Sequence, residues 1–130
     1  MLYNPKAIKN VVLDGHSLTL ESFVAVARFG ATVELAPSAM EAMKKSRALA
    51  EKIAAEKRVA YGITTGFGDF QKVAVSAEMS NQLSTNLILS HCTAMGEPYA
   101  DEVSRGMLLL RAKALCEGVS GVRPLLVGLL

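Results

Sequence analysis

The sequence has few of the residues that stabilise small secreted domains. It contains two cysteines, Cys92 and Cys116, no tryptophan, and only 5% aromatic residues. Two cysteines make no disulfide framework, so we interpret both as ordinary thiols of a reducing compartment. The opening segment, Met1 to Lys9, is short and polar, unlike a signal or transit peptide. We therefore expect a cytoplasmic protein.

Long apolar runs, an excess of one charge and metal-ligand clusters are also lacking. No run approaches the ~18 apolar residues that a membrane span needs. Fourteen basic residues against twelve acidic ones give a net charge of +2, which leaves no basic face suited to nucleic acid. We therefore expect no membrane span, no nucleic-acid partner and no bound metal. The histidines and cysteines lack the spacing of a zinc site; they are His16, His91, Cys92 and Cys116.

Apolar residues are abundant instead. They make up 51% of the chain, and much of this content is Ala, Val, Leu and Met, which suits packed helices. Average usage is about 45–50% even when glycine is counted as apolar. A chain of 130 residues is one domain or part of one. The apolar surplus indicates a surface that a partner covers, either more of the same chain or other subunits.

Turn and cap signals divide the first part of the chain. The apolar run 11–13, followed by Asp14-Gly15, predicts a small hairpin. Thr19 is placed to cap a short helix that Gly30 ends. The segment from Thr32 to Leu35 predicts another short strand.

Two longer helices are predicted next. Ser38 and Glu41 have the spacing of a capping box, which predicts a helix that continues to about Arg58. Helical spacing returns from Ser76 to about Cys92. One face of that second helix is predicted to carry Met79, Leu83, Leu87 and His91.

The last part of the chain predicts two more helices. The first covers 101–117, and Gly118 ends it. Its run 107–110 is apolar all round, so we expect that helix to be buried on most sides. Pro124 suits the first position of the next helix. The segment 125–130 is almost wholly apolar and has no stop signal, so we expect the chain to stop inside a larger fold.

The segment from Tyr61 to Gly68 is the first candidate site. It contains three glycines, which exclude a regular helix or strand. Their spacing matches neither a phosphate-binding loop nor a dinucleotide fingerprint. From the residues alone, two interpretations stay open. The loop holds Tyr61 over a site as a general acid or base, or it is a plain turn with a half-buried aromatic ring.

Three further side chains lie among apolar residues. His91 shares a helix face with Leu83 and Leu87, where a histidine is more often a hydrogen-bonded core residue than a ligand. Arg111 and Arg123 each need a carboxylate or carbonyl partner if they are buried. We therefore predict a buried ion pair for each arginine.

Taken together, these segments resemble the ammonia-lyases that act on histidine, phenylalanine and tyrosine. The loop Tyr61-Gly-Ile-Thr-Thr-Gly-Phe-Gly68 resembles the fingerprint of that family and is highly specific. The resemblance covers nearly the whole chain. The segments that follow the loop come in the family's order and at its approximate spacing: Asn86-Leu-Ile-Leu-Ser-His91, Gly96-Glu97-Pro98, Met107-Leu-Leu-Leu-Arg-Ala112 and Ser120-Gly-Val-Arg-Pro124.

The resemblance implies a mainly helical fold with a few short strands near the N-terminus, of which residues 1–130 are the N-terminal part. It implies a homotetramer, in which the remainder of the lyase chain and other subunits are the partners. It also implies an electrophile, methylidene-imidazolone, that forms from an internal Ala-Ser-Gly, and no metal or nucleotide. These 130 residues contain no Ala-Ser-Gly. We expect that triad beyond Leu130, and we expect the 130-residue chain alone to be inactive.

The resemblance also assigns roles by position. Tyr61 matches the loop tyrosine, an acid or base near the electrophile. Ser90-His91 matches the pair that contacts the substrate side chain, and Ser-His is the form found in the histidine branch. The implied reaction is elimination of ammonia from L-histidine to give urocanate. The rest of the loop is implied to form part of a lid, with Gly68 also contacting the substrate: Gly62, Thr64, Thr65, Gly66 and Phe67.

Two departures from the histidine branch keep alternatives open. Thr64 stands where that branch usually has Asn, and Ser84-Thr85 replaces a frequent Gln-Arg. The alternative enzyme is a phenylalanine or tyrosine ammonia-lyase, or an aminomutase. The alternative of another class is a non-catalytic or split-enzyme module that only binds and assembles.

Overall fold

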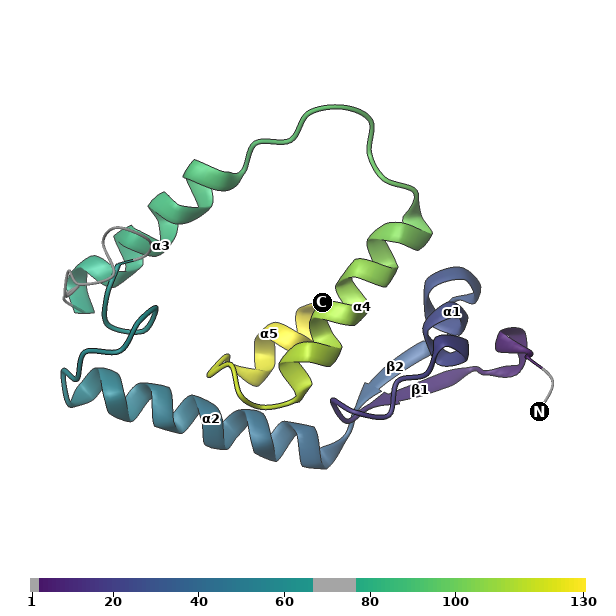
Figure 1. The fold of residues 1–130 in the computed structure, drawn as a ribbon, viewed down its shortest axis with the longest axis horizontal. Helices are drawn as coiled ribbons and strands as arrows, with labels where there is room; N and C mark the ends of the chain where they lie inside the picture. The colour runs from purple at the N-terminus through teal and green to yellow at the C-terminus, as the bar shows by residue number, and fades with distance from the viewer. Residues whose placement is uncertain (1–2, 67–76) are drawn as a thin grey trace. The chain divides into compact units, whose positions relative to one another are not determined.

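The computed structural model describes residues 3–66 and 77–130. The chain divides into two compact units, the first formed by Met1–Ala48 with Pro98–Leu130 and the second by Leu49–Glu97. Helices predominate and two short strands lie near the N-terminus, which confirms the predicted fold class. Figure 1 shows the elements in chain order: η1 (Pro5–Ala7), β1 (Asn10–Leu13), α1 (Leu20–Phe29), β2 (Thr32–Leu35), α2 (Pro37–Ala55), α3 (Ala77–His91), α4 (Asp101–Cys116) and α5 (Pro124–Leu129).

The two strands form a parallel pair, so the predicted hairpin is wrong. β1 and β2 lie side by side in one direction, with Val11 opposite Val33, and α1 makes the crossover between them (Figure 1). The turn at Asp14 leads into that crossover instead of back along β1. Its carboxylate Oδ1 accepts hydrogen bonds from the backbone N–H groups of His16 at 2.7 Å and Ser17 at 2.8 Å.

The boundaries of α1 agree with the sequence prediction. The Oγ1 atom of Thr19 accepts a hydrogen bond from the N–H of Ser22 at 3.1 Å, as an N-cap side chain does. Gly30 ends the helix in the left-handed region, with φ of 68°. Both signals are local, and both are confirmed.

The capping box predicted for the next helix is wrong. α2 begins at Pro37, because proline is well suited to the first helical position. Ser38 is therefore inside the helix, and the carboxylate of Glu41 pairs with Lys44 Nζ at 2.7 Å. The helix ends at Ala55, three residues before the predicted end.

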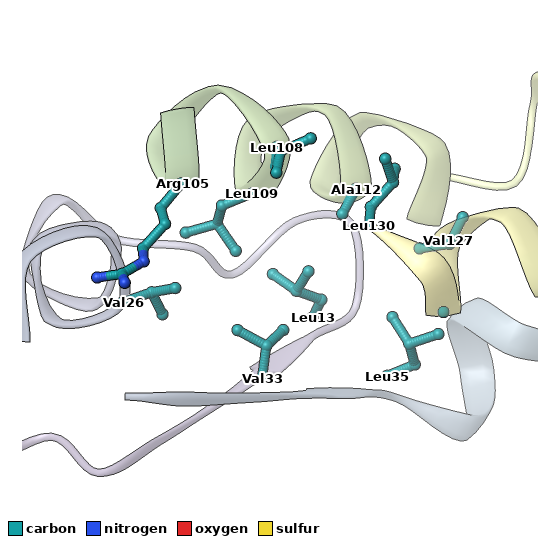
Figure 2. Close-up of a pocket in the computed structure, with 11 residues that line it drawn as sticks. Leu13, Val26, Val33, Leu35, Arg105, Leu108, Leu109, Ala112, Val127 and Leu130 are labelled. Atoms are coloured by element: carbon teal, nitrogen blue, oxygen red, sulfur yellow. The ribbon is translucent and has the colours of Figure 1, made fainter. Parts of the chain in front are cut away.

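The hydrophobic core of the first unit lies between the two strands and the helices α1, α2, α4 and α5. Leu13, Met43 and Cys116 are its largest fully buried side chains. Aliphatic side chains from both strands, α1, α4 and α5 also surround a cavity of about 240 Å³, and Figure 2 shows them facing one another. The core therefore holds two segments distant in sequence, the N-terminal βαβ unit and the final two helices, in one body.

The run 107–110 of α4 is less buried than predicted. Leu109 faces the core and is 5% exposed. Met107, Leu108 and Leu110 are 57%, 45% and 52% exposed. In the described structure the helix packs with one face only, and the prediction of burial on most sides is wrong.

Candidate functional site

The turn that follows α2 is held by the hydroxyl groups of two threonines. Thr64 Oγ1 donates to the carbonyl of Arg58 at 2.6 Å and accepts from the N–H of Ala60 at 2.9 Å. Thr65, only 3% exposed, accepts from the N–H of Gly62 at 3.3 Å. Gly62 has a φ of 72°, a left-handed conformation that favours glycine.

These bonds position the tyrosine of the turn. Tyr61 is 65% exposed, so its phenol is accessible. Gly66 is buried and accepts a hydrogen bond from Thr65 Oγ1 at 3.1 Å. The threonine hydroxyls serve the turn itself, while the tyrosine points its bulk outward. Two further residues predicted for this site, Phe67 and Gly68, lie outside the described residues.

The C-terminal end of α3 brings Ser90 and His91 together. Ser90 Oγ lies 2.9 Å from His91 Nδ1, and both atoms lie 2.9 Å from the carbonyl oxygen of Leu87. Both side chains are exposed. The prediction that His91 faces a buried surface is wrong within this chain, because Leu87 on the same face is itself 36% exposed.

The structure thus forms two local clusters within the second unit. One is the turn with Tyr61, Thr64 and Thr65, and the other is the Ser90–His91 pair. Sequence reasoning found the side chains of both clusters. It missed the Leu87 carbonyl as a partner of His91, although a polar side chain in a helix can bond to the carbonyl three or four residues earlier.

The two arginines do not form buried ion pairs. Arg111 and Arg123 are both exposed, and among the residues that the structure describes neither takes part in an ion pair. Each arginine keeps its charge in water, so neither needs a buried partner. We therefore assign no binding or catalytic role to these two arginines.

None of the predicted site residues lines the apolar cavity of the first unit. Arg105 is the only charged residue in its lining, and Figure 2 shows the guanidinium at one edge of the cavity. A lining of aliphatic side chains offers no acid, base or nucleophile. In 3–66 and 77–130, no group of three or more His, Cys, Asp or Glu side chains is arranged to hold a metal ion. In that same part of the chain, no helix is long and apolar enough to cross a membrane.

Comparison with known proteins gives a consistent family. Histidine ammonia-lyase of Alkaliphilus metalliredigens is 48% identical over 117 residues, which cover 90% of this chain and 23% of that protein. Histidine ammonia-lyase of a Geobacillus species (strain WCH70) is 50% identical over 117 residues, with the same two coverages. The chain thus spans about a quarter of the length of these relatives.

The fold is also similar to that of solved structures. The crystal structure of ergothionase from Treponema denticola superposes with a TM-score of 0.86 and 29% identity, over 92% of this chain and 24% of that one. The family model for aromatic amino acid lyases matches residues 18–130. With a match over most of its length, the chain belongs to the aromatic amino acid lyase family.

Proposed function

We propose that these residues are the N-terminal portion of a histidine ammonia-lyase, which eliminates ammonia from L-histidine to give urocanate. The observation that carries the proposal is the exposed Ser90–His91 pair at the end of α3. The relatives that are 48% and 50% identical and carry that enzyme's name support the histidine branch. The residue pair Ser-His at these positions also agrees with the histidine branch of the family.

Tyr61 is the proposed acid or base of the reaction. A phenol can transfer a proton when it lies within hydrogen-bond reach of the substrate. The turn supports this role, because Thr64 and Thr65 fix the backbone around Tyr61 and leave its side chain 65% exposed. In this proposal Gly62 and Gly66 serve the same turn. Phe67 keeps its proposed role in the lid and Gly68 its proposed contact with the substrate, and both lie outside the described residues.

Ser90 and His91 are proposed to bind the substrate side chain. An imidazole ring can exchange a hydrogen bond with His91, and a phenyl ring cannot. A site built around such a bond rejects an analogue that lacks the group. The pair is therefore proposed to determine substrate choice, and Thr64 is compatible with it because its hydroxyl is already bonded to Arg58 and Ala60.

The proposed enzyme needs the electrophile methylidene-imidazolone, which would activate the amino acid substrate when it is present. The residues described here do not supply it, since the sequence contains no Ala-Ser-Gly. We therefore assign to this chain only positioning, substrate binding and proton transfer. The proposal includes a cytoplasmic homotetramer whose other partners are the remaining residues of the lyase, with no metal or nucleotide.

A chimaera tests the proposal. The matching 117 residues of the Geobacillus enzyme are replaced by those of this chain, because 50% identity favours correct packing. We expect the chimaera to form urocanate from histidine, measured by ultraviolet absorbance, and to leave phenylalanine largely unreacted. The 130-residue chain alone is the negative control.

The oligomeric state of the chimaera is compared with that of the Geobacillus parent, so that failed assembly is recognised. A chimaera that assembles like the parent and fails to turn over histidine would contradict the proposal. Preference for phenylalanine or tyrosine would support the alternative branch instead.

A further inference from the structure

The hydrogen bonds at the end of α3 determine which ring nitrogen of His91 carries the proton. Three atoms lie at mutual distances of 2.9 Å: Ser90 Oγ, His91 Nδ1 and the Leu87 carbonyl oxygen. A neutral imidazole has one N–H donor and one bare nitrogen acceptor. The hydrogen-bond partners of the two ring nitrogens determine which of them is protonated.

The Leu87 carbonyl decides between the two tautomers, because it can only accept. With the proton on Nδ1, both Ser90 and His91 donate to Leu87, and Ser90 Oγ also accepts from the ring. With the proton on Nε2, the bare Nδ1 faces the carbonyl oxygen at 2.9 Å with no hydrogen between them. That contact is repulsive, so the first arrangement is the favoured one.

The opposite nitrogen of the ring, Nε2, is available as far as the described residues are concerned. In the parts of the chain that the structure describes, 3–66 and 77–130, no hydrogen-bond partner is found for Nε2 of His91. The ring is also exposed. Its free nitrogen is thus an outward-facing acceptor when the ring is neutral.

We propose that Ser90 is a positioning residue, which together with the Leu87 carbonyl holds the proton of neutral His91 on Nδ1 and presents Nε2 as a hydrogen-bond acceptor. Such a nitrogen selects side chains that donate an N–H or O–H group. That this donor is the imidazole N–H of a histidine substrate rests on the proposed function. The tautomer of His91 does not depend on the proposed function. A serine hydroxyl therefore acts on substrate choice through the ring beside it.

Nuclear magnetic resonance tests the tautomer on the 130-residue chain. The chain has only two histidines, so a His16→Gln variant leaves His91 as the single imidazole. Long-range ¹H–¹⁵N correlation at about pH 8.5, where an ordinary imidazole is neutral, distinguishes a protonated from a bare ring nitrogen. We expect Nδ1 to be protonated and Nε2 to be bare in most molecules.

Substitutions at Ser90 test its role. With the proton on Nδ1, Ser90 donates to Leu87 and accepts from the ring; with the proton on Nε2, its single hydrogen serves only one of these two partners. Ser90→Ala should therefore lower the ratio of the Nδ1–H to the Nε2–H form roughly three- to ten-fold, the effect of one hydrogen bond. Ser90→Thr, which keeps the hydroxyl, should restore the ratio. Alanine favours helix, so the variant is expected to keep α3, and circular dichroism checks this.

Thr85→Val is the matched control. Thr85 Oγ1 donates to the carbonyl of Asn81 at 3.0 Å, which is the same kind of bond on the same helix without His91. We expect this variant to leave the His91 ratio unchanged. A wild-type ring that is mainly in the Nε2–H form would overturn the proposal, and so would a Ser90→Ala ratio equal to that of the wild type. These results do not depend on lyase activity, so they fail or succeed separately from the proposed function.

Discussion

Side chains with hydroxyl groups have different tasks in the candidate site. Thr64 and Thr65 use their oxygens to close the turn after α2, with bonds to Ala60 and Gly62. Ser90 uses its oxygen on the ring of His91. Tyr61 is 65% exposed in this turn, and it is the residue proposed to transfer a proton.

The first prediction concerns the Tyr61 hydroxyl. In the chimaera, Tyr61→Phe should lower kcat for histidine by about 10²-fold or more, the lower range for a lost acid or base. KM should change little, because the variant keeps the aromatic ring. Steady-state kinetics on the two proteins measure this, and wild-type turnover by the phenylalanine variant would show that the Tyr61 hydroxyl takes no part in the reaction.

The second prediction concerns Asp14 and pH. Hydrogen bonds from the backbone N–H groups of Ser17 and His16 lower the pKa of this carboxyl from 3.8 to about 2. A lowered pKa stabilises the fold above the unfolded value, and that stability is lost as pH falls through about 2. Asp14→Asn mimics the protonated acid.

Thermal unfolding followed by circular dichroism measures the effect of Asp14→Asn. The variant should unfold at a lower temperature than the wild type at pH 7, and the difference should shrink as the pH approaches about 2. If the difference in unfolding temperature stays constant from pH 7 down to about 2, the ionised Asp14 carboxylate does not stabilise this turn.

At the scale of elements, local signals in the sequence were sufficient for helix ends and not for strand pairing. Thr19 and Gly30 determine the ends of α1 through contacts within a few residues, so the sequence predicts them. The partner of β1 is chosen by packing of α1 across the sheet, which no short pattern specifies. At α2 two local signals compete, and Pro37 prevails over Ser38 and Glu41.

The candidate residues could be named from the sequence for a related reason. Tyr61, Ser90 and His91 belong to continuous motifs, so the sequence names them. Their surroundings were less predictable. The exposure of His91 depends on what covers α3, and the bonds to the Leu87 carbonyl depend on a rotamer.

The third prediction separates backbone strain from crowding at two glycines. Gly30 and Gly118 have φ of 68° and 71°, but only Gly118 is crowded, since a Cβ there would lie 2.5 Å from that of Ala42. Gly30→Ala should cost about 1–2 kcal/mol, the penalty of a left-handed alanine. Gly118→Ala should cost about 1–3 kcal/mol more, because it overpacks the contact with α2.

Urea denaturation of the two alanine variants measures both free energies of unfolding. Equal losses would mean that the contact between Gly118 and Ala42 relaxes freely. A larger loss for Gly30→Ala would contradict the account of how the end of α4 packs on α2.

At the scale of the whole molecule, the compact core belongs to one of the two units. The buried apolar side chains come from 1–48 and 98–130. The α3 helix of the other unit leaves Met79, Ile88 and Leu89 each at least 64% exposed. This chain spans about a quarter of the length of its relatives. We expect the other residues of such a longer protein to cover these exposed surfaces.

The fourth prediction is that the 130-residue chain self-associates. Leu125 and Leu129 on α5 are 67% and 76% exposed, and Leu108 and Leu110 on α4 are 45% and 52% exposed. Exposed apolar surface of this kind favours association. Sedimentation should show a mass that rises with concentration, and a Leu125→Glu, Leu129→Glu double variant should reduce the effect. A wild-type chain that stays monomeric at high concentration would count against it.

The central claim is that Ser90 and His91 select histidine as the substrate. The most direct measurement is the ratio of kcat/KM for histidine to kcat/KM for phenylalanine, in the chimaera and in its Ser90→Phe, His91→Leu double variant. Thr85→Val serves as the control on the same helix. In this proposal the pair forms a hydrogen bond with the imidazole ring of histidine, which a phenyl ring cannot form. The account therefore predicts a fall of roughly 100-fold or more in the ratio for the double variant. A double variant that assembles normally and keeps the original ratio would contradict the account.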